Sequence, residues 1–281
     1  MKFYAQLQLS LAAFAIVNAR GPTVHRYSST WSPSLLTEKS GKRSIIFDMD
    51  DTLYSKFDGL QSQLLDALLN YVGRKTGIYH ENEEATPEMK QRAYYLMKDY
   101  YKTYGLTLKG LRVNNKNGVD FDDYDAFIKS ELDYSNAQQI EGLVEMLKEL
   151  KDNPRNQLAI MTNSCWLHVE STLMQLGIYD LFDHIFVADC HDHNMVSKPN
   201  PIVYSQVQHA LGHANPRDCY FIDDNFSFVE AAQLVGWNAV WLNESAPQQD
   251  QVTPVEPEIL QKGTVGHILQ MREAFNELFS E

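Results

Sequence analysis

The chain has 281 residues, 44% of them hydrophobic, which suffices for one large domain or for one domain that carries an insert. Its formal net charge of −13 argues against a general binder of nucleic acid polymers, because such proteins need lysine and arginine to contact phosphates. No apolar run reaches about 18 residues, so the sequence predicts no membrane span.

Residues 1–43 are predicted to be an N-terminal extension or targeting segment outside the fold. Residues 1–37 contain no acidic side chain and carry Arg20, Arg26 and several serines, a composition typical of a mitochondrial presequence. The apolar stretch before residues 17–19 also fits a secretory signal, and a disordered extension is the third interpretation. Three widely spaced cysteines do not suggest a disulfide framework, so an intracellular protein, mitochondrial or cytoplasmic, is favoured over a secreted one.

Five short runs rich in Ile, Val and Phe are predicted to be buried parallel strands. They lie at residues 44–47, 157–161, 184–187, 219–222 and 239–242. Helical patterns separate the later runs: one begins at Pro201 and ends near Gly212, and another precedes Gly236. This alternation predicts an α/β fold, a doubly wound (Rossmann-like) parallel sheet built from residues 44–55 and 152–243.

Residues 56–151 lie between the first two predicted strands and are too many for one crossover helix. Leucines recur at helical spacing at the start of this insert. Thr86 is predicted to cap a second helix whose first residue is Pro87, and Gly105 is predicted to end it. A further helix is expected to begin near Asp122 or Asp123. The insert therefore predicts a helical cap domain.

The remaining segments are predicted to be structural. Residues 244–281 contain a linker rich in Pro, Gln and acidic residues, followed by a pattern that predicts a C-terminal amphipathic helix. The tyrosines of the insert, such as Tyr94, Tyr100 and Tyr101, are expected to lie in a core more often than in a ligand site.

Polar side chains follow several of the predicted strands. Asp48 and Asp50 follow the first strand, Thr162 follows the second, and Asp224 follows the fourth. Lys198 lies in the loop after the third strand. Because ligands bind at the carboxyl edge of open α/β sheets, we expect these groups to meet there.

This combination of groups has a chemical logic. Asp48 and Asp224, with Asp223 nearby, can hold Mg²⁺, which also relieves the repulsion between clustered carboxylates. Asp50 is expected to have a raised pKa if it is partly desolvated, and can then act as a general acid. Thr162 and Lys198 can bind anionic oxygens, so the set predicts phosphoryl transfer.

The sequence resembles the haloacid dehalogenase superfamily in four motifs that occur in order. They are DMDDT at 48–52, Thr162, Lys198-Pro199 and Asp223-Asp224. The resemblance implies an aspartate nucleophile and Mg²⁺. Asp50, which the namesake dehalogenases lack, favours by resemblance a phosphatase or a phosphomutase.

A closer resemblance is to the pyrimidine 5′-nucleotidase family of fungi and plants. The segments that carry it are FDMDDTLY (47–54), YYKTYGLTLKGL (100–111), DFDDYDAFI (120–128) and FIDDN (221–225). Membership would imply a helical cap and the release of phosphate from nucleoside 5′-monophosphates, although relatives of similar sequence act on other small phosphomonoesters.

The resemblance also implies catalytic roles. Asp48 would attack phosphorus and form an aspartyl-phosphate, and Asp50 would protonate the leaving oxygen and later deprotonate water. Mg²⁺ would be held by the Asp48 side chain, the Asp50 carbonyl and Asp224, with Asp223 as a co-ligand or as a residue behind the ligands.

On the same basis, Thr162 and Asn163 would contact the phosphoryl oxygens, and Lys198 would neutralise charge. The substrate is therefore expected to be a small phosphorylated compound. Three alternatives stay open: a phosphatase of sugar phosphates or lysophosphatidate, a phosphomutase, and a regulatory scaffold without activity. The sequence does not indicate an oligomeric state.

Overall fold

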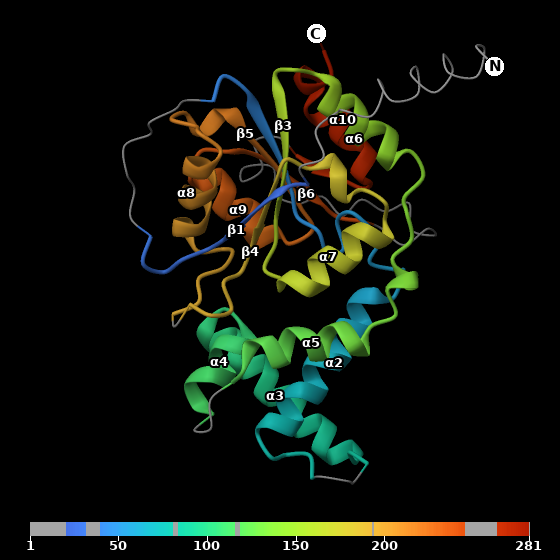
Figure 1. Ribbon diagram of the computed structural model, residues 1–281, viewed down its shortest axis with the longest axis vertical. Helices are drawn as coiled ribbons and strands as arrows, with labels where there is room; N and C mark the ends of the chain where they lie inside the picture. The colour runs from blue at the N-terminus through green and yellow to red at the C-terminus, as the bar shows by residue number, and fades with distance from the viewer. Residues whose placement is uncertain are drawn as a thin grey trace, which may run out of the picture.

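The computed structural model describes residues 21–31, 40–80, 84–115, 119–192, 194–244 and 263–280. These residues contain a seven-stranded parallel sheet with the strand order β1-β4-β3-β2-β5-β6-β7 (Figure 1). The strands are β1 (Thr23–Arg26), β2 (Arg43–Phe47), β3 (Asn156–Met161), β4 (His184–Val187), β5 (Cys219–Asp223), β6 (Asn238–Leu242) and β7 (Thr264–Val265). The five predicted strands are confirmed, each to within one residue at either end, and so is the α/β class.

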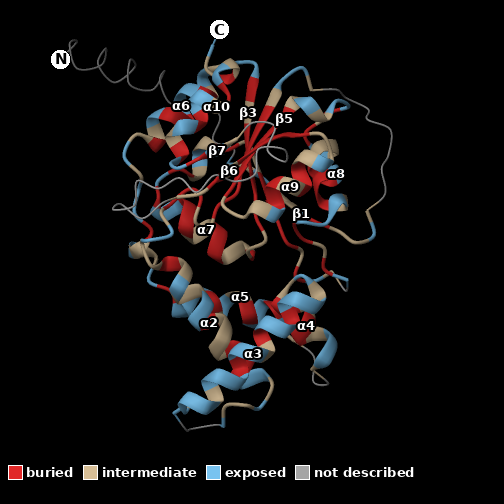
Figure 2. Ribbon diagram, turned by 180° about the vertical axis from the view of Figure 1, so that it is seen from behind, coloured by how far each residue is buried: buried red, intermediate tan, exposed pale blue. Residues whose placement is uncertain are grey.

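The strand β2 shows why helices cover both faces of the sheet. Its apolar residues alternate: Ile45 and Phe47 lie in one hydrophobic cluster and Ile46 lies in another. The first cluster includes residues of α6 (Leu143–Asp152), α7 (Trp166–Gln175) and α10 (Met271–Ala274). The second includes residues of α8 (Pro201–Ala210) and α9 (Phe226–Leu234). Figure 2 shows the resulting buried layers on either side of the sheet.

Four helices form the cap at the carboxyl edge of the sheet (Figures 1 and 2). They are α2 (Leu60–Lys75), α3 (Pro87–Tyr104), α4 (Thr107–Asn114) and α5 (Phe121–Glu131). The Thr86 hydroxyl accepts a hydrogen bond from the Met89 amide at 3.3 Å, so it caps α3 as expected. Gly105, with φ of 78°, ends that helix.

The boundaries of the insert and of the extension differ from the expectation. Strand β1 belongs to the segment that composition assigns to an N-terminal extension, yet it pairs along its whole length with β4. Helix α6 falls inside the predicted insert, but it packs on the sheet through Leu143, Met146, Leu147 and Leu150. The amino-acid composition of a segment can indicate targeting, but whether the segment joins the sheet depends on strands that are far away in sequence. Within the predicted extension or targeting segment, residues 1–43, residues 1–20 and 32–39 lie outside the described residues.

The C-terminal amphipathic pattern does not form one helix. It forms short turns at Ile268–Gln270 and Asn276–Leu278 with the four-residue α10 between them. Phe275, with φ of −132° and ψ of 50°, interrupts the helix, and its buried ring packs edge-on against Tyr220 at 5.2 Å. Ile268, Met271, Phe275 and Leu278 of this pattern are buried, and Phe279 is partly buried. The apolar spacing thus indicated the buried side of the segment but not its backbone conformation.

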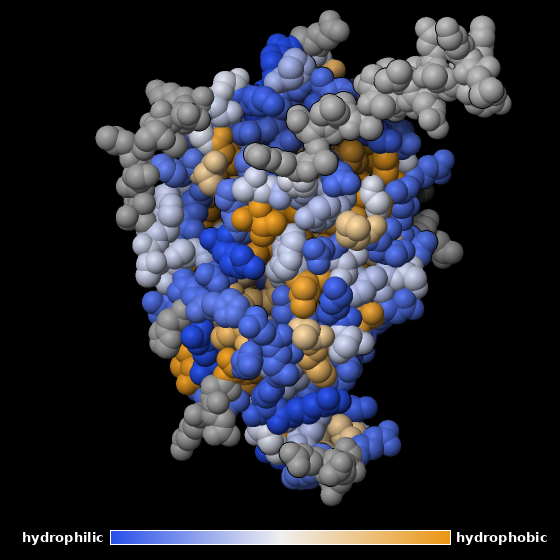
Figure 3. Space-filling model, in the orientation of Figure 1, coloured by the Kyte–Doolittle hydropathy of each residue, from blue (hydrophilic) through white to orange (hydrophobic). Residues whose placement is uncertain are grey.

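No helix in the described part of the chain is long and apolar enough to cross a membrane. On the face drawn in Figure 3, hydrophilic residues predominate and hydrophobic residues occur as separate patches. This distribution agrees with the acidic composition of the chain.

Candidate active site

The first part of the site is a buried ion cluster where β2 and β5 end. Asp48 continues the sheet beyond β2, because its amide donates to the Ile222 carbonyl at 2.9 Å. The Lys198 ammonium lies 2.6 Å from Asp48 Oδ1 and 2.7 Å from Asp223 Oδ2. The side chains of Lys198 and Asp48 are 1% and 8% exposed, and that of Asp223 is not exposed. The loop lysine and two strand-end carboxylates therefore meet as predicted.

One ammonium does not balance the negative charge of this cluster. Burial raises the pKa of Asp48 well above its usual value; Lys198 opposes this rise, while Asp223 and Asp224 add to it. Burial and the neighbouring Asp223 likewise raise the pKa of Asp224 to about 7. The site thus has a deficit of positive charge that a cation would correct.

Three carboxylates fit such a cation. Asp48, Asp223 and Asp224 can each offer an oxygen, and the three oxygens lie within 4.8 Å of one another. Oxygen ligands of this kind suit Mg²⁺. Both Asp223 oxygens already accept hydrogen bonds, one from Lys198 and one from the Asn225 amide at 2.8 Å. No described residue donates to the Asp224 carboxylate, which makes Asp224 the more available ligand.

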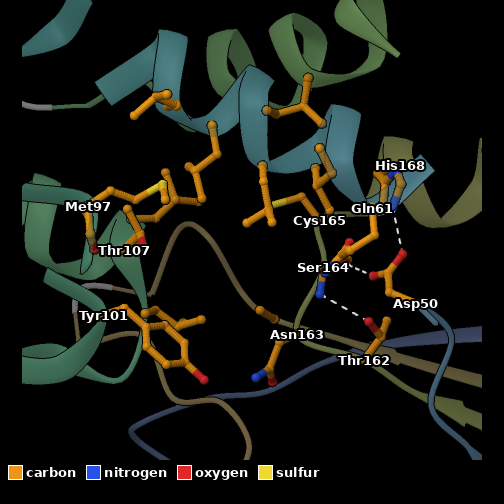
Figure 4. Close-up of a pocket in the computed structure, with 18 of the residues that line it drawn as sticks. Asp50, Gln61, Met97, Tyr101, Thr107, Thr162, Asn163, Ser164, Cys165 and His168 are labelled. Atoms are coloured by element: carbon orange, nitrogen blue, oxygen red, sulfur yellow. Dashed lines mark hydrogen bonds and ion pairs between the residues drawn. The ribbon is translucent and has the colours of Figure 1, made fainter. Parts of the chain in front are cut away.

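Asp50 occupies a different environment two residues along the chain. Its carboxylate accepts hydrogen bonds from the Tyr54 hydroxyl at 2.8 Å and the Ser164 hydroxyl at 2.5 Å. The ring nitrogen Nε2 of His168, a side chain that is 1% exposed, lies 2.9 Å from Asp50 Oδ1 (Figure 4). Burial raises the pKa of Asp50, but His168, Ser164 and Tyr54 together bring it below the usual value. The expected raised pKa of Asp50 is therefore wrong.

The sequence reasoning missed these three partners of Asp50. A signal was present: Tyr54 follows Asp50 by four residues, and His168 follows Ser164 by four, the spacing of one helical turn. Ser164 also stands directly after the predicted pair Thr162-Asn163. What sequence alone did not show is that α7 would aim His168 at Asp50 from a distant part of the chain.

Thr162 and Asn163 lie at the end of β3. Thr162 is 1% exposed, and its hydroxyl accepts a hydrogen bond from the Ser164 amide at 3.1 Å. The Asn163 side chain bonds to the backbone of Lys198 in both directions, donating at 3.0 Å and accepting at 2.9 Å. The two hydrogen bonds of Asn163 thus hold the loop that carries Lys198 in position, a contact that the sequence did not predict.

A cavity of about 1000 Å³ lies between the cap and the sheet edge. Six of the seven predicted site residues line it, and Asp223 lies behind them. Its cap side is mainly apolar, formed by Leu64, Leu65, Leu68, Leu69, Met97, Leu106, Leu108 and Ile128. Tyr94 and Tyr101, expected in a core, are 43% and 49% exposed and line the cavity. Figure 4 shows the Tyr101 hydroxyl pointing toward the side of the cavity that holds Asn163.

Comparison with known proteins identifies the family of the chain. Residues 42–236 match the family model described as haloacid dehalogenase-like hydrolase. The yeast protein "Phosphate metabolism protein 8" of Saccharomyces cerevisiae is 30% identical over 217 residues, which are 74% of this chain. The chain spans only 64% of the length of that relative.

Two solved structures share the fold. The putative HAD-hydrolase YfnB from Bacillus subtilis, bound to magnesium, is 19% identical with a TM-score of 0.54, covering 84% of this chain and 99% of its own. L-2-haloacid dehalogenase from Xanthobacter autotrophicus is 16% identical with a TM-score of 0.51, also covering 84% of this chain and 99% of its own. At these identities the likeness concerns the fold alone.

Proposed function

The chain belongs to the haloacid dehalogenase-like hydrolase family, and we propose that it is a Mg²⁺-dependent phosphatase of small phosphomonoesters, with pyrimidine nucleoside 5′-monophosphates as the favoured substrates. One observation carries the proposal. Asp48 and Asp50 face the same cavity but are held differently, Asp48 by the Lys198 ammonium and Asp50 by three hydrogen-bonding partners. Two carboxylates in distinct environments suit a nucleophile and a separate proton carrier.

Asp48 is the nucleophile in this proposal. Lys198 contacts its Oδ1 at 2.6 Å, and the Thr52 hydroxyl donates to its Oδ2 at 3.3 Å, so the orientation of the carboxylate is restrained. Attack of Asp48 on phosphorus forms an aspartyl-phosphate and releases the substrate alcohol. Water then hydrolyses the aspartyl-phosphate and regenerates the carboxylate.

Asp50 carries the proton in both steps. Its lowered pKa makes it a carboxylate in the free protein, which suits the second step, when it takes a proton from water. In the first step it must donate a proton. A phosphate dianion bound beside it raises the pKa of Asp50 by like-charge repulsion, which favours the protonated form when substrate is present.

The residues that would hold Mg²⁺ are Asp48, Asp224 and, by resemblance, the Asp50 carbonyl, with Asp223 adjacent. When bound, the ion would neutralise charge on the phosphoryl oxygens. Lys198 supplies a fixed positive charge at the same edge, and the buried Thr162 hydroxyl is placed to contact a phosphoryl oxygen.

The nucleotide preference is supported by the resemblance of residues 100–111 to pyrimidine 5′-nucleotidases and by the Tyr101 ring in the cavity wall, which can pack on a base. A second candidate substrate is a lysophosphatidate. The row of leucines that α2 contributes to the cavity favours it, because an acyl chain would bury apolar surface there.

The test is phosphate release from CMP, UMP, AMP, GMP, sugar phosphates and lysophosphatidate, with Mg²⁺ and with EDTA. We expect Mg²⁺-dependent release that is fastest with CMP and UMP, and a loss of at least about 10³-fold in Asp48→Asn. The matched control is Asp152→Asn, the same change at an exposed residue of α6, which should keep full activity.

Other outcomes separate the alternatives. Release from lysophosphatidate or sugar phosphates alone would keep the mechanism and change the substrate. Movement of phosphate to another hydroxyl of the substrate, without release, would indicate a phosphomutase. If no compound reacts, or if Asp48→Asn keeps its activity, the proposed function is wrong.

A further inference from the structure

Two cysteines meet in the wall of the cavity. Cys165 Sγ and Cys190 Sγ lie 2.7 Å apart, although the residues are 25 positions apart in sequence. Both are free thiols, 7% and 8% exposed, and both line the cavity of about 1000 Å³. A disulfide has an S–S bond of about 2.05 Å, so closing it requires only about 0.7 Å of approach. We propose that Cys165 and Cys190 form a reversible disulfide that lowers the turnover of the enzyme.

The two thiols lie on the two loops that carry the predicted phosphate-binding residues. Cys165 precedes α7 and directly follows Ser164, at the end of β3. Cys190 lies in the loop between β4 and Lys198. A bond between them would connect these loops near Tyr124 of α5, which interacts with both cysteines and also lines the cavity.

Cys165 lies between two of the partners that hold Asp50. Ser164 is its neighbour in sequence, and His168 lies one turn further along α7 (Figure 4). A movement of Cys165 toward Cys190 therefore displaces both partners relative to the Asp50 carboxylate. Misplacement of catalytic groups by about 1 Å can cost about 10²-fold in rate, so a shift of this size is large enough to affect turnover.

The third cysteine provides an internal control. Cys219 is fully buried in β5, packs in the hydrophobic cluster on the opposite face of the sheet, and is not part of the cavity wall. An oxidant must reach a thiol to react with it, so burial away from the cavity disfavours oxidation of Cys219. Raised thiol pKa values do not distinguish the cysteines, because the contact with Cys190 and burial raise the pKa of Cys165 as well. The difference lies in access and in the 2.7 Å contact between Cys165 and Cys190.

The oxidant in the proposal is a peroxide, which accepts the two electrons that the two thiols lose. One thiolate attacks a peroxide oxygen, the O–O bond breaks, and a sulfenic acid forms. The second thiol then attacks the sulfenic sulfur, the S–S bond forms, and water leaves. In total, two thiols and one hydrogen peroxide give one disulfide and two waters. A dithiol reductant reverses the reaction by thiol–disulfide exchange.

The experiment treats the reduced full-length chain with hydrogen peroxide, alkylates the remaining thiols under denaturing conditions and maps the peptides without reduction. We expect one cross-linked pair, Cys165 with Cys190, lighter by two hydrogens than the separate peptides, and an alkylated Cys219. Separate alkylation of Cys165 and Cys190, or a sulfinic acid on either without a cross-link, would overturn the proposal.

The effect on turnover rests on the proposed phosphatase function and is measured with p-nitrophenyl phosphate. Peroxide should lower the rate about tenfold, and dithiothreitol should restore it. Cys165→Ser and Cys190→Ser should each keep their own reduced rate after peroxide, whereas Cys219→Ser should respond like the natural chain. A mapped disulfide without a change in rate would refute the control of turnover. If the reduced chain releases phosphate neither from p-nitrophenyl phosphate nor from any compound of the substrate panel above, the phosphatase function is wrong, while the peptide map still decides the disulfide.

Discussion

At the scale of single residues, Lys198 compensates part of the negative charge of the buried carboxylates in the site. Its ammonium contacts Asp48 and Asp223, and it also lies 5.0 Å from the ring centroid of Phe228 and 5.5 Å from that of Phe221. Burial alone lowers the pKa of Lys198, but the two carboxylates outweigh this effect and raise it above its usual value. The lysine therefore stays charged in an almost dry environment.

Lys198→Met keeps most of the side-chain volume but removes the charge. We expect the free energy of unfolding to fall by about 3 kcal/mol, because two buried carboxylates lose their cation. The measurement is urea denaturation in EDTA. Lys148→Met, at an exposed position of α6, is the matched control and should change stability by less than about 0.5 kcal/mol. Equal stability of the two variants would show that the ion cluster does not stabilise the fold.

His25 on β1 is a second residue whose charge state depends on the fold. Its ring stacks on Phe186 at 4.4 Å, and its Nε2 lies 3.2 Å from Nδ1 of His184. Burial and the neighbouring His184 lower the pKa of His25 from 6.5 to about 4. Between these two values the unfolded chain binds a proton that the folded chain does not, so stability falls as the pH drops from about 6.5 toward 4.

His25→Phe should reduce this acid sensitivity while keeping the stacked ring. The expected result is a smaller loss of stability between pH 7 and pH 5 than in the natural chain, measured by urea denaturation at both pH values. His80→Phe, at an exposed histidine of the cap, should retain the natural difference. If His25→Phe loses as much stability as the natural chain, His25 is not part of the acid response.

The individual site residues show what sequence can and cannot predict. Asp48, Thr162 and Asp224 could be placed because each follows an apolar run, and parallel strands end at one edge. The hydrogen bond from Tyr54 to Asp50 is local, and the four-residue spacing was a signal for it. The contacts of Ser164 and His168 with Asp50 could not be predicted, because they depend on how the segment after β3 and helix α7 lie relative to a distant part of the chain. The raised pKa expected for Asp50 was wrong for this reason: burial was anticipated, but the three partners that oppose its effect were not.

At the scale of elements, the cap depends on a close crossing of α3 and α4. Gly110 of α4 faces Tyr100 of α3, and a Cβ atom at Gly110 would lie 2.9 Å from the Cα atom of Tyr100. A backbone atom inside a helix cannot move aside as the end of a flexible side chain can. The absence of a side chain at Gly110 therefore sets how near the two helices can pack.

Gly110→Ala should destabilise the protein by about 1–3 kcal/mol, as overpacking does. Helix propensity alone predicts the opposite sign, because alanine is favoured over glycine by about 1 kcal/mol in a helix. Gly41→Ala is the control, since a Cβ there meets no atom within 4 Å. The measurement is the urea midpoint of each variant, and a more stable Gly110→Ala would disprove the crowding.

The elements also differ in how well sequence predicted them. The five central strands are continuous apolar runs and were placed to within one residue at either end, and Thr86 and Gly105 correctly mark the ends of α3. Strand β1 reads TVHR and has no apolar run, so nothing local indicates that it joins a sheet. Its place in the sheet depends on pairing with β4, and the local sequence of β1 carries no information about that pairing.

At the scale of the whole molecule, an acidic chain encloses an acidic site. The formal net charge is −13, and three clustered carboxylates face one buried ammonium. A cation that binds the folded chain but not the unfolded chain stabilises the fold, by about 2.7 kcal/mol when its concentration is 100-fold above Kd.

Mg²⁺ should therefore raise the melting temperature, and EDTA should reverse the increase. Asp224→Asn should lose most of this response, because it removes the carboxylate that is most available to a metal. Asp152→Asn should keep it, and sodium chloride at equal ionic strength should not reproduce it. A Mg²⁺ response that is unchanged in Asp224→Asn would mean that the ion binds elsewhere.

Strand β1 has a consequence for how the chain can be shortened. It covers the backbone of β4 from Thr23, paired with His184, to Arg26, paired with Val187, and Tyr27 beyond it is 1% exposed. A chain trimmed to begin at Ser40 would leave β4 as the outermost strand, with the apolar residues Ile185–Val187 along a bare edge. Such edges recruit strands from other molecules. A trimmed chain should therefore self-associate more strongly than a chain that keeps residues 23–27.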